Sequence, residues 1–537
     1  MKKRIIKSTF IGASMMLCFS LTSCDSDNSI ETKVEETTIS NTNTNTSSVK
    51  ETTTVSGTTT STKVQETTST LTTTTNLGNG SNEFIHKDNT LNLDSTLLTK
   101  NFSGDSTDKK ITFHHTMNDS LQSILQYAIA SFKNKYPDWD VESTLVGGYP
   151  DVYNSCSSAL ASGEQPDLAY CYPEHVADYL KTGKVVDISD YVNAMGTING
   201  NQIGYTAEEQ SDFIQGYYKE GLALNYADYN KYGYSGTDIL SFPFVKTTEV
   251  LYYNEEELIE AGIVDNNGKA KAPTTWDELW ADCEILKNKS PKCVPLSYDS
   301  EANWIVTMCA QNDWDYIQAK KPNYLFNNKN VENWFDFLSN QYNKKYFTTQ
   351  KLYGKYTTGL LSIGLEYGGS AFYIGSSSGA SRVDLNKKKI AVAPIPGSKL
   401  KDGTINNKSI FLGPSLVMFQ SEKKNATERQ LMTWEFVKCL EDAEFQTIFS
   451  LVSGYTPTRL SSFETAAYKS YIEDQTSIIP ATAKVISTIS NNYYYTPAFV
   501  GTSNARDAVQ SAFLAVLRGE KTSDKALEEA LNSCLSK

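Results

Sequence analysis

Two neighbouring histidines, His114 and His115, end a short apolar stretch and are the first side chains along the folded part of the chain that suggest chemistry. Neutral imidazoles are common metal ligands. The stretch ITFHH has the pattern of a strand, in which successive side chains point to opposite faces. Adjacent histidines on a strand therefore cannot both face one ion, and the chain has only four histidines. We expect no metal site, which leaves ligand contact or a structural role for this pair.

The acidic residues and serines form no recognisable catalytic pattern. A hydrolase acting on glycans would need two carboxylates held about 5–10 Å apart, and the acids of this chain are scattered. The sequence has no His-Glu-x-x-His, no Gly-x-Ser-x-Gly and no phosphate-binding loop. The stretch GSSSG at 375–379 also lacks the pattern of a nucleophile elbow. We therefore expect that the protein is not an enzyme and needs no cofactor.

Cys24 is a candidate for chemical modification, because it follows the features of an export signal. Four basic residues stand among the first seven, a short apolar run covers 11–20, and small residues precede the cysteine. This run is too short to span a bilayer as a mature helix. The ending LTSC at 21–24 resembles the bacterial lipobox, whose cysteine is acylated after cleavage just before it. We expect a lipoprotein signal over 1–23 and a lipid anchor at Cys24; the alternative is an ordinary signal in which this cysteine is incidental.

Charge and cysteine content limit the partners. The net charge is −13, and removal of the signal, with four positive charges and no acids, leaves −17. An acidic chain without a basic run is a poor partner for nucleic acid. Seven cysteines remain after the signal and the anchor, and none forms a Cys-x-x-Cys pair. Cys156–Cys171 and Cys283–Cys293 are the candidate local disulfides of an exported chain, and the sequence does not settle the pairing.

The composition changes sharply between the anchor and residue 108. This segment is nearly all Thr, Ser, Asn and Gly, with few apolar residues, as in ETTTVSGTTTSTKVQETTSTLTTTTN. Such a segment cannot bury enough surface to offset its ordering entropy. We expect residues 24–108 to be a disordered tether, long enough to reach through a thick cell wall.

Helix and strand patterns begin near Lys109. A strand is expected in KKITFHH, and an apolar stripe at helical spacing from Leu121 to Phe132 predicts a helix that Pro137 ends. Residues 141–146 and the stretch PDLAYC predict further strands. The segment APTTWDELWADCEILKNK predicts a helix capped by Thr275. Strands that alternate with helices over more than 400 residues indicate an α/β protein with mainly parallel sheets, and this length favours two lobes.

Several stretches, taken in order, resemble the family 1 extracellular solute-binding proteins of ABC importers. They include GEQPDLAYCYPEHVADYLKTGKVVDISDYV, SFPFVKTTEVLYYNEEELIEAGI, GGSAFYIGSSSGA, FLGPSLVMF and LVSGYTPTR, and the closing helices ARDAVQSAFLAVLRGEKTSDKALEEALNSC. The resemblance covers nearly all of 109–537. Each piece is weak alone, and their shared order and spacing is the stronger signal. The loop sequences are most similar to those of the family members that bind sugars and glycerol phosphate.

The resemblance implies a two-lobed α/β fold of the type II periplasmic-binding-protein kind, with three interlobe crossings. We expect these crossings near Pro243–Glu249, Ala393–Gly397 and Gly454–Arg459. Residues 109–245 and 397–455 would form the first lobe, and 246–396 and 456–537 the second. A ligand would lie in the cleft between the lobes, where strand ends and helix starts converge.

A sugar site needs flat aromatic faces and a few hydrogen-bonding groups, and the chain has 32 Tyr and 7 Trp. Trp304 is a candidate stacking platform or else a core residue, and Tyr455 is the leading aromatic candidate. Arg506 suits a phosphate or paired hydroxyls, unless it makes a surface ion pair. The ligand-binding residues implied by the resemblance are His115, Thr116, Asn118, Tyr172, Glu174, Trp304, Ser377, Ser378, Gly413, Tyr455 and Arg506. For each of these candidate residues other than Trp304, Tyr455 and Arg506, the alternative is a turn, a loop or a structural role without ligand contact.

The expected function is capture of a carbohydrate, mono- or oligosaccharide, and delivery to the permease of an ABC transporter. Glycerol phosphate is the other ligand class that the resemblance implies. The lipid anchor would hold the protein on the outer face of the bacterial cytoplasmic membrane, in a Gram-positive type of envelope. A cell-surface glycan hydrolase and a glycan-binding adhesin are the alternatives; an adhesin explains the tether but not the crossings.

Overall fold

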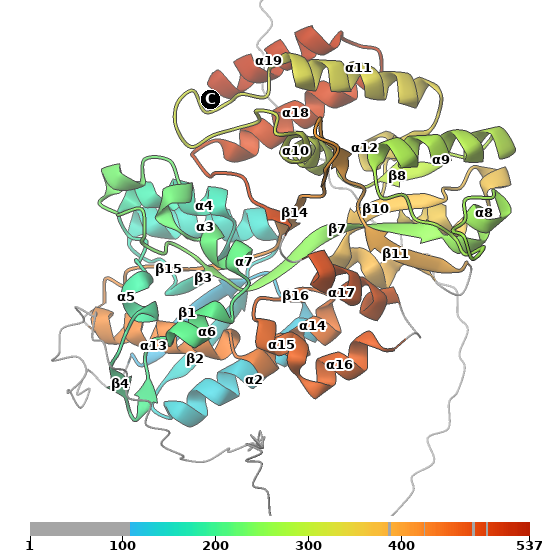
Figure 1. Ribbon diagram of the computed structural model, residues 1–537. Coiled ribbons are helices and arrows are strands. Elements are labelled where there is room, and N and C mark those ends of the chain that lie inside the picture. Colours follow the sequence, from blue (N-terminus) through green and yellow to red (C-terminus); the bar gives the residue numbers. More distant parts are fainter. Residues whose placement is uncertain (1–107, 385–387, 424, 475–477, 490–491, 537) are drawn as a thin grey trace, which may run out of the picture. The chain divides into compact units, whose positions relative to one another are not determined.

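The computed structural model describes residues 108–384, 388–423, 425–474, 478–489 and 492–536. The expected signal, the anchor at Cys24 and nearly all of the expected tether lie outside these residues. The described chain builds two α/β lobes, each around its own mixed sheet (Figure 1).

The first lobe contains a five-stranded sheet in the order β2-β1-β3-β15-β6. Its strands are β1 (Lys110–His115), β2 (Asp140–Leu145), β3 (Leu168–Cys171), β6 (Phe242–Pro243) and β15 (Ser415–Met418). Its main helices are α2 (Asp119–Lys135), α3 (Tyr149–Ser162), α4 (Pro173–Tyr179), α7 (Gln215–Glu220), α13 (Ala426–Leu440) and α14 (Ala443–Ser453). Helices α13 and α14 pack on α2, although some 300 residues separate them along the chain (Figure 1).

Helix α2 shows how the sequence forms these elements. The Asn118 side chain accepts a hydrogen bond from the Leu121 amide and caps the helix start. Leu125, Ala128 and Phe132 recur on one face and are fully buried, which is the spacing of an amphipathic helix. The helix predicted from this stripe is therefore present, and it ends at Lys135, two residues before Pro137.

The second lobe has a larger sheet in the order β17-β14-β7-β10-β8-β9, with β11 and β16 also paired to β7. Its strands are β7 (Val245–Asn254), β8 (Leu296–Tyr298), β9 (Phe347–Thr349), β10 (Phe372–Ser376), β11 (Ile390–Pro394), β14 (Ser409–Leu412), β16 (Thr456–Pro457) and β17 (Tyr493–Tyr494). Its main helices are α8 (Glu255–Glu260), α9 (Trp276–Lys289), α10 (Glu301–Asn312), α11 (Lys329–Asn343), α17 (Ile478–Ile489), α18 (Thr502–Leu517) and α19 (Ser523–Leu535).

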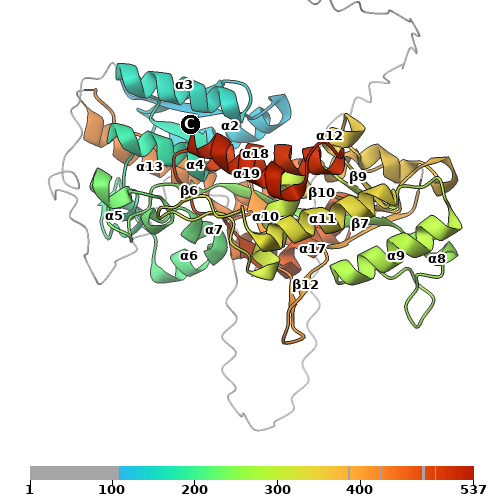
Figure 2. The same ribbon diagram turned by 90° about the horizontal axis from the view of Figure 1, so that it is seen from above.

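Helices α18 and α19 pack on α10 and α11 and close one side of the second lobe (Figure 2). Helix α9 has the predicted cap, because Thr275 accepts from the Glu278 amide at 3.2 Å. The Glu278 carboxylate also accepts from the Thr274 amide at 2.7 Å. These short bonds satisfy amides at the helix start that have no partner within the helix.

The chain passes between the two sheets at three places. Strand β6 continues into β7 through Phe244, β14 continues into β15 through Gly413 and Pro414, and α14 leads into β16 through Gly454 and Tyr455. The first passage lies in the segment named from the sequence. In the third segment, Thr456 and Pro457 pair with the start of β7, but the Thr458 carbonyl accepts from the Ile214 amide of the first lobe at 2.8 Å. The expected lobe boundary at 456 therefore comes too early in the chain.

The expected crossing at Ala393–Gly397 is wrong. Ala393 pairs with Leu251 inside the second sheet, and the Gly397 amide donates to the Thr274 carbonyl of the same lobe. Residues 397–412 therefore belong to the second lobe, and the second passage comes later, at Gly413–Pro414. The proline-rich stretch APIPG has a sequence like that of a crossing. In the structure it leads into the hairpin of β12 (Ser398–Lys399) and β13 (Ile405–Asn406).

The sheets are mixed rather than mainly parallel. Strand β7 runs antiparallel to β10, β11, β14 and β16. Of these, β14 and β16 adjoin passages between the lobes, and β10 and β11 lie within the second lobe. Cys156, Cys171, Cys283 and Cys293 are buried free thiols, so neither of the two candidate disulfides is formed. In the part of the chain that the structure describes, no helix has the length and apolarity to cross a membrane.

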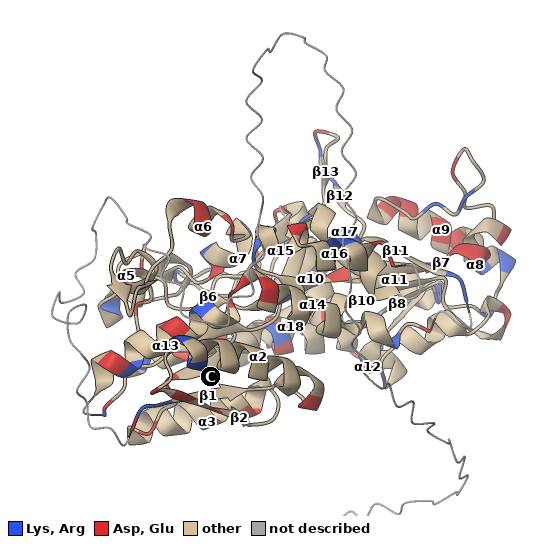
Figure 3. Ribbon diagram, turned by 90° about the horizontal axis from the view of Figure 1, so that it is seen from below, with Lys and Arg blue, Asp and Glu red and all other residues tan. Residues whose placement is uncertain are grey.

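The acidic character of the chain is visible on the second lobe and on one short helix of the first. Seen from below, acidic residues gather on α8, α9 and α6 (Ala207–Ser211), as Figure 3 shows. Several lysines are paired with these acids, such as Lys389 with Glu255 at 3.1 Å.

Candidate functional site

Two cavities lie on either side of the passage at Gly413 and Pro414. The first, named here the Arg506 cavity, has a volume of about 340 Å³ and is lined by Gly413. The second, the Tyr455 cavity, has a volume of about 450 Å³ and is lined by Pro414. Both are lined by residues of the two lobes, so a molecule held there would contact both lobes at once.

A buried chain of hydrogen bonds positions the cation of the Arg506 cavity. The Arg506 guanidinium donates to the Asn303 side-chain oxygen. The Asn303 amide group in turn donates to the Glu249 carboxylate at 3.0 Å, and the Tyr298 hydroxyl donates to its other oxygen. Burial raises the pKa of Glu249 to about 7, with Asp299 adding to the shift and Arg506 opposing it. Strand β7 thus orients a guanidinium on α18 through one asparagine on α10.

Two carboxylates line the same cavity. Glu174 stands in the first turn of α4, and burial raises the pKa of its carboxyl group. Glu220 ends α7 and forms an ion pair with Lys246, a residue of β7 that is fully buried. Lys246 also donates to the Ser415 hydroxyl at 3.0 Å and to the Gly413 carbonyl at 3.3 Å. The Arg506 cavity therefore offers donors and acceptors side by side.

Aromatic rings form the wall of the Tyr455 cavity. Tyr149, Tyr170 and Tyr455 line it together with Phe449. Tyr149 also packs against Tyr172 of the Arg506 cavity, with ring centroids 4.5 Å apart. Tyrosines of this kind present an apolar face and a hydroxyl, and their contact joins the walls of the two cavities.

Comparison with known proteins identifies the family. Residues 127–476 match the family model of the bacterial extracellular solute-binding proteins. This chain belongs to that family. The sn-glycerol-3-phosphate-binding periplasmic protein UgpB of Escherichia coli K12 is 21% identical over 441 residues, which cover 78% of this chain and 90% of UgpB.

Solved structures show the same two-lobed fold. The sugar-binding protein MalE from Xanthomonas citri has a TM-score of 0.62 at 17% identity, covering 80% of this chain and 98% of MalE. UgpB from Mycobacterium tuberculosis, solved in complex with glycerophosphocholine, has a TM-score of 0.60 at 15% identity, covering 80% and 98%. The expected fold class is confirmed, and relatives of this solute-binding protein are named as binding proteins.

Eight of the eleven candidate ligand residues line the two cavities of this solute-binding protein. Tyr172, Glu174, Gly413 and Arg506 line the Arg506 cavity, and Thr116, Asn118, Ser378 and Tyr455 line the Tyr455 cavity. Their contacts with a ligand stay predictions.

Two more of the eleven candidates are fully buried near the cavities. His115 Nδ1 accepts from the Met117 amide at 3.0 Å, and the Ser377 hydroxyl accepts from the Thr248 amide at 3.3 Å. Burial lowers the pKa of His115 to about 4, so this imidazole is neutral at pH 7.

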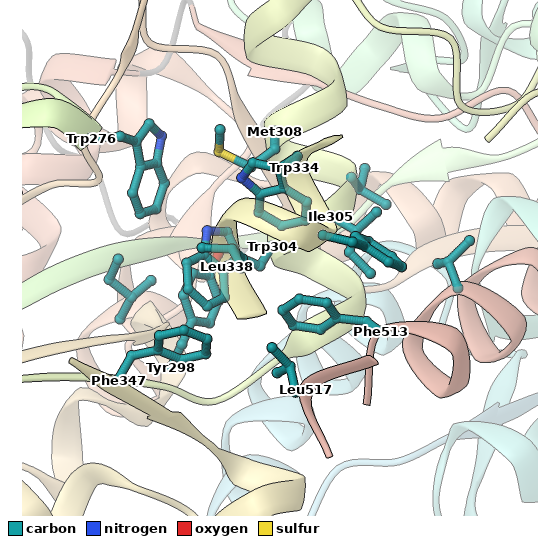
Figure 4. Close-up of a cluster of buried hydrophobic side chains, with 14 of the residues drawn as sticks. Trp276, Tyr298, Trp304, Ile305, Met308, Trp334, Leu338, Phe347, Phe513 and Leu517 are labelled. Atoms are coloured by element: carbon teal, nitrogen blue, oxygen red, sulfur yellow. The ribbon is translucent and has the colours of Figure 1, made fainter. Parts of the chain in front are cut away.

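Of the two roles left open for Trp304, stacking platform or core residue, the structure favours the second, and Trp304 lines neither cleft cavity. Its side chain is 1% exposed in the core of the second lobe. It stacks on Tyr298 with ring centroids 4.7 Å apart, and the edges of Phe347 and Phe513 surround it (Figure 4). Asn303, one position earlier on α10, is the residue that faces the Arg506 cavity. A step of one residue on a helix turns the side chain by about 100°.

Sequence reasoning missed several lining residues. Tyr494 and Tyr495 belong to the run NNYYYTP, whose three consecutive tyrosines are a signal for an aromatic site. Asn303 had no signal beyond its position next to Trp304. Glu220 had none either, because its place depends on the ion pair with Lys246, which is distant in the sequence.

Proposed function

We propose that this solute-binding protein captures a carbohydrate in the cleft formed by the Arg506 and Tyr455 cavities and delivers it to the permease of an ABC importer. The observation that carries the proposal is the joined tyrosine wall beside a mixed set of donors and acceptors from both lobes. Sugar rings offer apolar C–H faces to aromatic rings and hydroxyls to the polar groups. The name of the MalE relative as a sugar-binding protein supports this ligand class.

Charge in the cavity favours a neutral ligand over an anion. Arg506 attracts a phosphate, but the carboxyl group of Glu174 lines the same space, and Glu220, whose charge Lys246 balances, lies beside it. A sugar hydroxyl can donate to a carboxylate and accept from a guanidinium, so a polyol uses all three groups. Glycerol phosphate remains the second candidate, because Arg506 is a suitable partner for a phosphate and the UgpB relatives are named for binding that ligand.

The proposed location follows from the sequence. The LTSC ending at Cys24 supports a lipid-anchored protein on the outer face of the cytoplasmic membrane, and the Thr-rich segment that follows supports a tether from the anchor to the binding lobes. Relatives described as extracellular or periplasmic agree with export of this chain.

A thermal-shift screen followed by calorimetric titration tests the ligand class. We expect mono- and oligosaccharides to raise the melting temperature, because a ligand that binds only the folded state stabilises it. Glycerol 3-phosphate and glycerophosphocholine belong in the same panel; stabilisation by these compounds alone would move the assignment to the second candidate. The sugar should be recovered intact after long incubation, and its conversion in proportion to protein would support a hydrolase instead.

Replacing Tyr455 with Ala tests the site. We expect affinity for the best sugar to fall about tenfold, since a desolvated stacking face contributes on the order of 1 kcal/mol or more. Tyr367→Ala is the matched control, because Tyr367 is 78% exposed and lines neither cavity. Unchanged affinity in Tyr455→Ala would place the ligand outside the Tyr455 cavity.

A further inference from the structure

A third cavity lies on the second lobe and shares no lining residue with the cleft. It has a volume of about 210 Å³ and runs beside α9, α10 and α11. Five of the seven tryptophans of the chain line it: Trp276, Trp280, Trp304, Trp314 and Trp334. We name it the tryptophan groove.

The groove opens to the protein surface and is not an enclosed packing void in the core. Phe337 on its wall is 40% exposed, and Trp280 and Trp314 are half-buried. Asp277 and Lys399 are exposed lining residues. Asn312 also lines it, and its amide group already donates to the Met308 carbonyl and the Ser398 hydroxyl. The Asn312 side-chain oxygen is therefore the atom left for an entering molecule.

An unsatisfied donor lies at the base of the groove. The indole N–H of Trp304 is buried and has no hydrogen-bond partner among the described residues. The neighbouring Trp276 differs, because its indole N–H donates to Gln311 at 2.7 Å. A buried donor without an acceptor is unfavourable, so an acceptor that entered the groove would recover part of this cost. Figure 4 shows Trp304 below Trp276, Met308 and Trp334, three residues that also line the groove.

We infer that the tryptophan groove is a second carbohydrate-binding site, separate from the cleft, which takes a single sugar ring or the end of a glycan chain. Its volume is below the range of about 300–1,000 Å³ typical of drug-sized ligands, which suits one ring. The indole faces of Trp280 and Trp314 stack on the ring, and Asp277, Asn312 and the Trp304 N–H bind its hydroxyls. Wide aromatic faces with polar groups at the edge favour this ligand over a purely apolar molecule.

The test uses the fluorescence of the tryptophans themselves. Only Trp139 and Trp434 lie outside the groove, and both are buried in the first lobe. Maltose and methyl β-glucoside are titrated into the wild type and into Arg506→Ala/Tyr455→Ala, in which cleft binding is disabled. We expect a saturable change of tryptophan fluorescence that persists in this cleft variant. Trp280→Ala should weaken it about tenfold, and Tyr367→Ala should leave it unchanged.

Asp277→Ala keeps the test decisive if Trp280→Ala fails to fold, because Asp277 is exposed and its replacement leaves the core intact. We expect this variant to weaken the groove signal at least fivefold with the melting temperature nearly unchanged. The inference is wrong if the cleft variant gives no fluorescence change with either sugar, and this result would leave the proposed function untouched. It is also wrong if the groove binds only an apolar probe such as toluene, or if Trp280→Ala alters only the oligomeric state in sedimentation.

Discussion

Among single residues, Glu249 has the clearest consequence for pH. Its carboxyl has a pKa raised to about 7, chiefly by burial, above the ordinary value of 4.5. The stability that the neutral form contributes is therefore fully present below pH 4.5 and is lost as the pH rises through 7. Ionisation of Glu249 lowers the stability of the fold but should favour ligand binding at the site. The carboxylate accepts from both Tyr298 and Asn303, which keeps the Asn303 oxygen directed at Arg506.

We therefore expect the affinity of the wild type for its best sugar to increase between pH 6 and pH 8. Glu249→Gln should weaken binding by roughly tenfold and remove this pH dependence, since a neutral side chain cannot accept both hydrogen bonds as the carboxylate does. Calorimetric titration at the two pH values measures both effects. Asp282→Asn is the matched control, because the pKa of Asp282 is also raised to about 7 by burial, yet it lines neither cleft cavity. A pH profile of Glu249→Gln that matches the wild type would contradict this role.

Residue type alone predicted part of the site and could not predict the rest. Tyr455 and Arg506 line the cavities, whereas Trp304 is buried in the core and its neighbour Asn303 lines a cavity instead. A tryptophan suits a sugar site and a core equally well, and only packing decides between them. Sequence reasoning favoured the larger aromatic side chain, and the structure places its polar neighbour in the cavity.

Among elements, the passage from β14 to β15 depends on a glycine. Gly413 has φ of +111°, and a Cβ placed on it would lie 2.5 Å from the Val245 carbonyl oxygen. We expect Gly413→Ala to destabilise the fold by about 2 kcal/mol or more, measured by chemical unfolding, because backbone strain and a backbone clash add together. Gly403→Ala is the control: its φ is +87°, with nothing within 4 Å of the added atom. Strain alone should cost it about 1 kcal/mol. Equal losses of unfolding free energy in both variants would mean that the backbone around Gly413 shifts to make room for the added Cβ atom.

Strand β7 also contributes Lys246 to a buried ion pair with Glu220 of α7. Lys246→Met leaves the carboxylate buried without its cation, so we expect a loss of about 3–5 kcal/mol in the free energy of unfolding. Lys408→Met is the comparison, since Lys408 pairs with Asp313 at 3.1 Å on the surface and such pairs contribute about 1 kcal/mol or less. If the two lysine variants unfold at the same denaturant concentration, the ion pair is not what holds β7 beside α7.

Local elements were predictable where one pattern decides them. The apolar stripe of α2 and the cap of α9 are both local in sequence, and both elements are present. The direction of the strands in the second sheet was not predictable, because β7 meets partners up to about 200 residues away along the chain. The second passage was misplaced for the same reason: a proline-rich turn and a crossing look alike until the pairing of Ala393 is known.

At the scale of the whole molecule, the proposed binding site and the proposed anchor lie in separate parts of the chain. Every residue that lines the Arg506 and Tyr455 cavities lies at position 116 or later, whereas the proposed anchor is Cys24. A change at the anchor should therefore alter where the protein is found without altering what it binds. This separation makes the two halves of the proposed function independently testable.

Cys24→Ala tests the anchor. We expect the variant to take up no radiolabelled palmitate and to leave the membrane fraction, because acyl chains supply the binding to the bilayer. Its affinity for the best sugar should equal that of the wild type. Cys18→Ala is the matched control, since that cysteine lies inside the proposed signal and is removed with it. Palmitate on the purified Cys24→Ala protein would contradict the anchor. Loss of label together with a changed affinity would show that attachment and capture are coupled, and the Thr-rich segment would then have to do more than connect them.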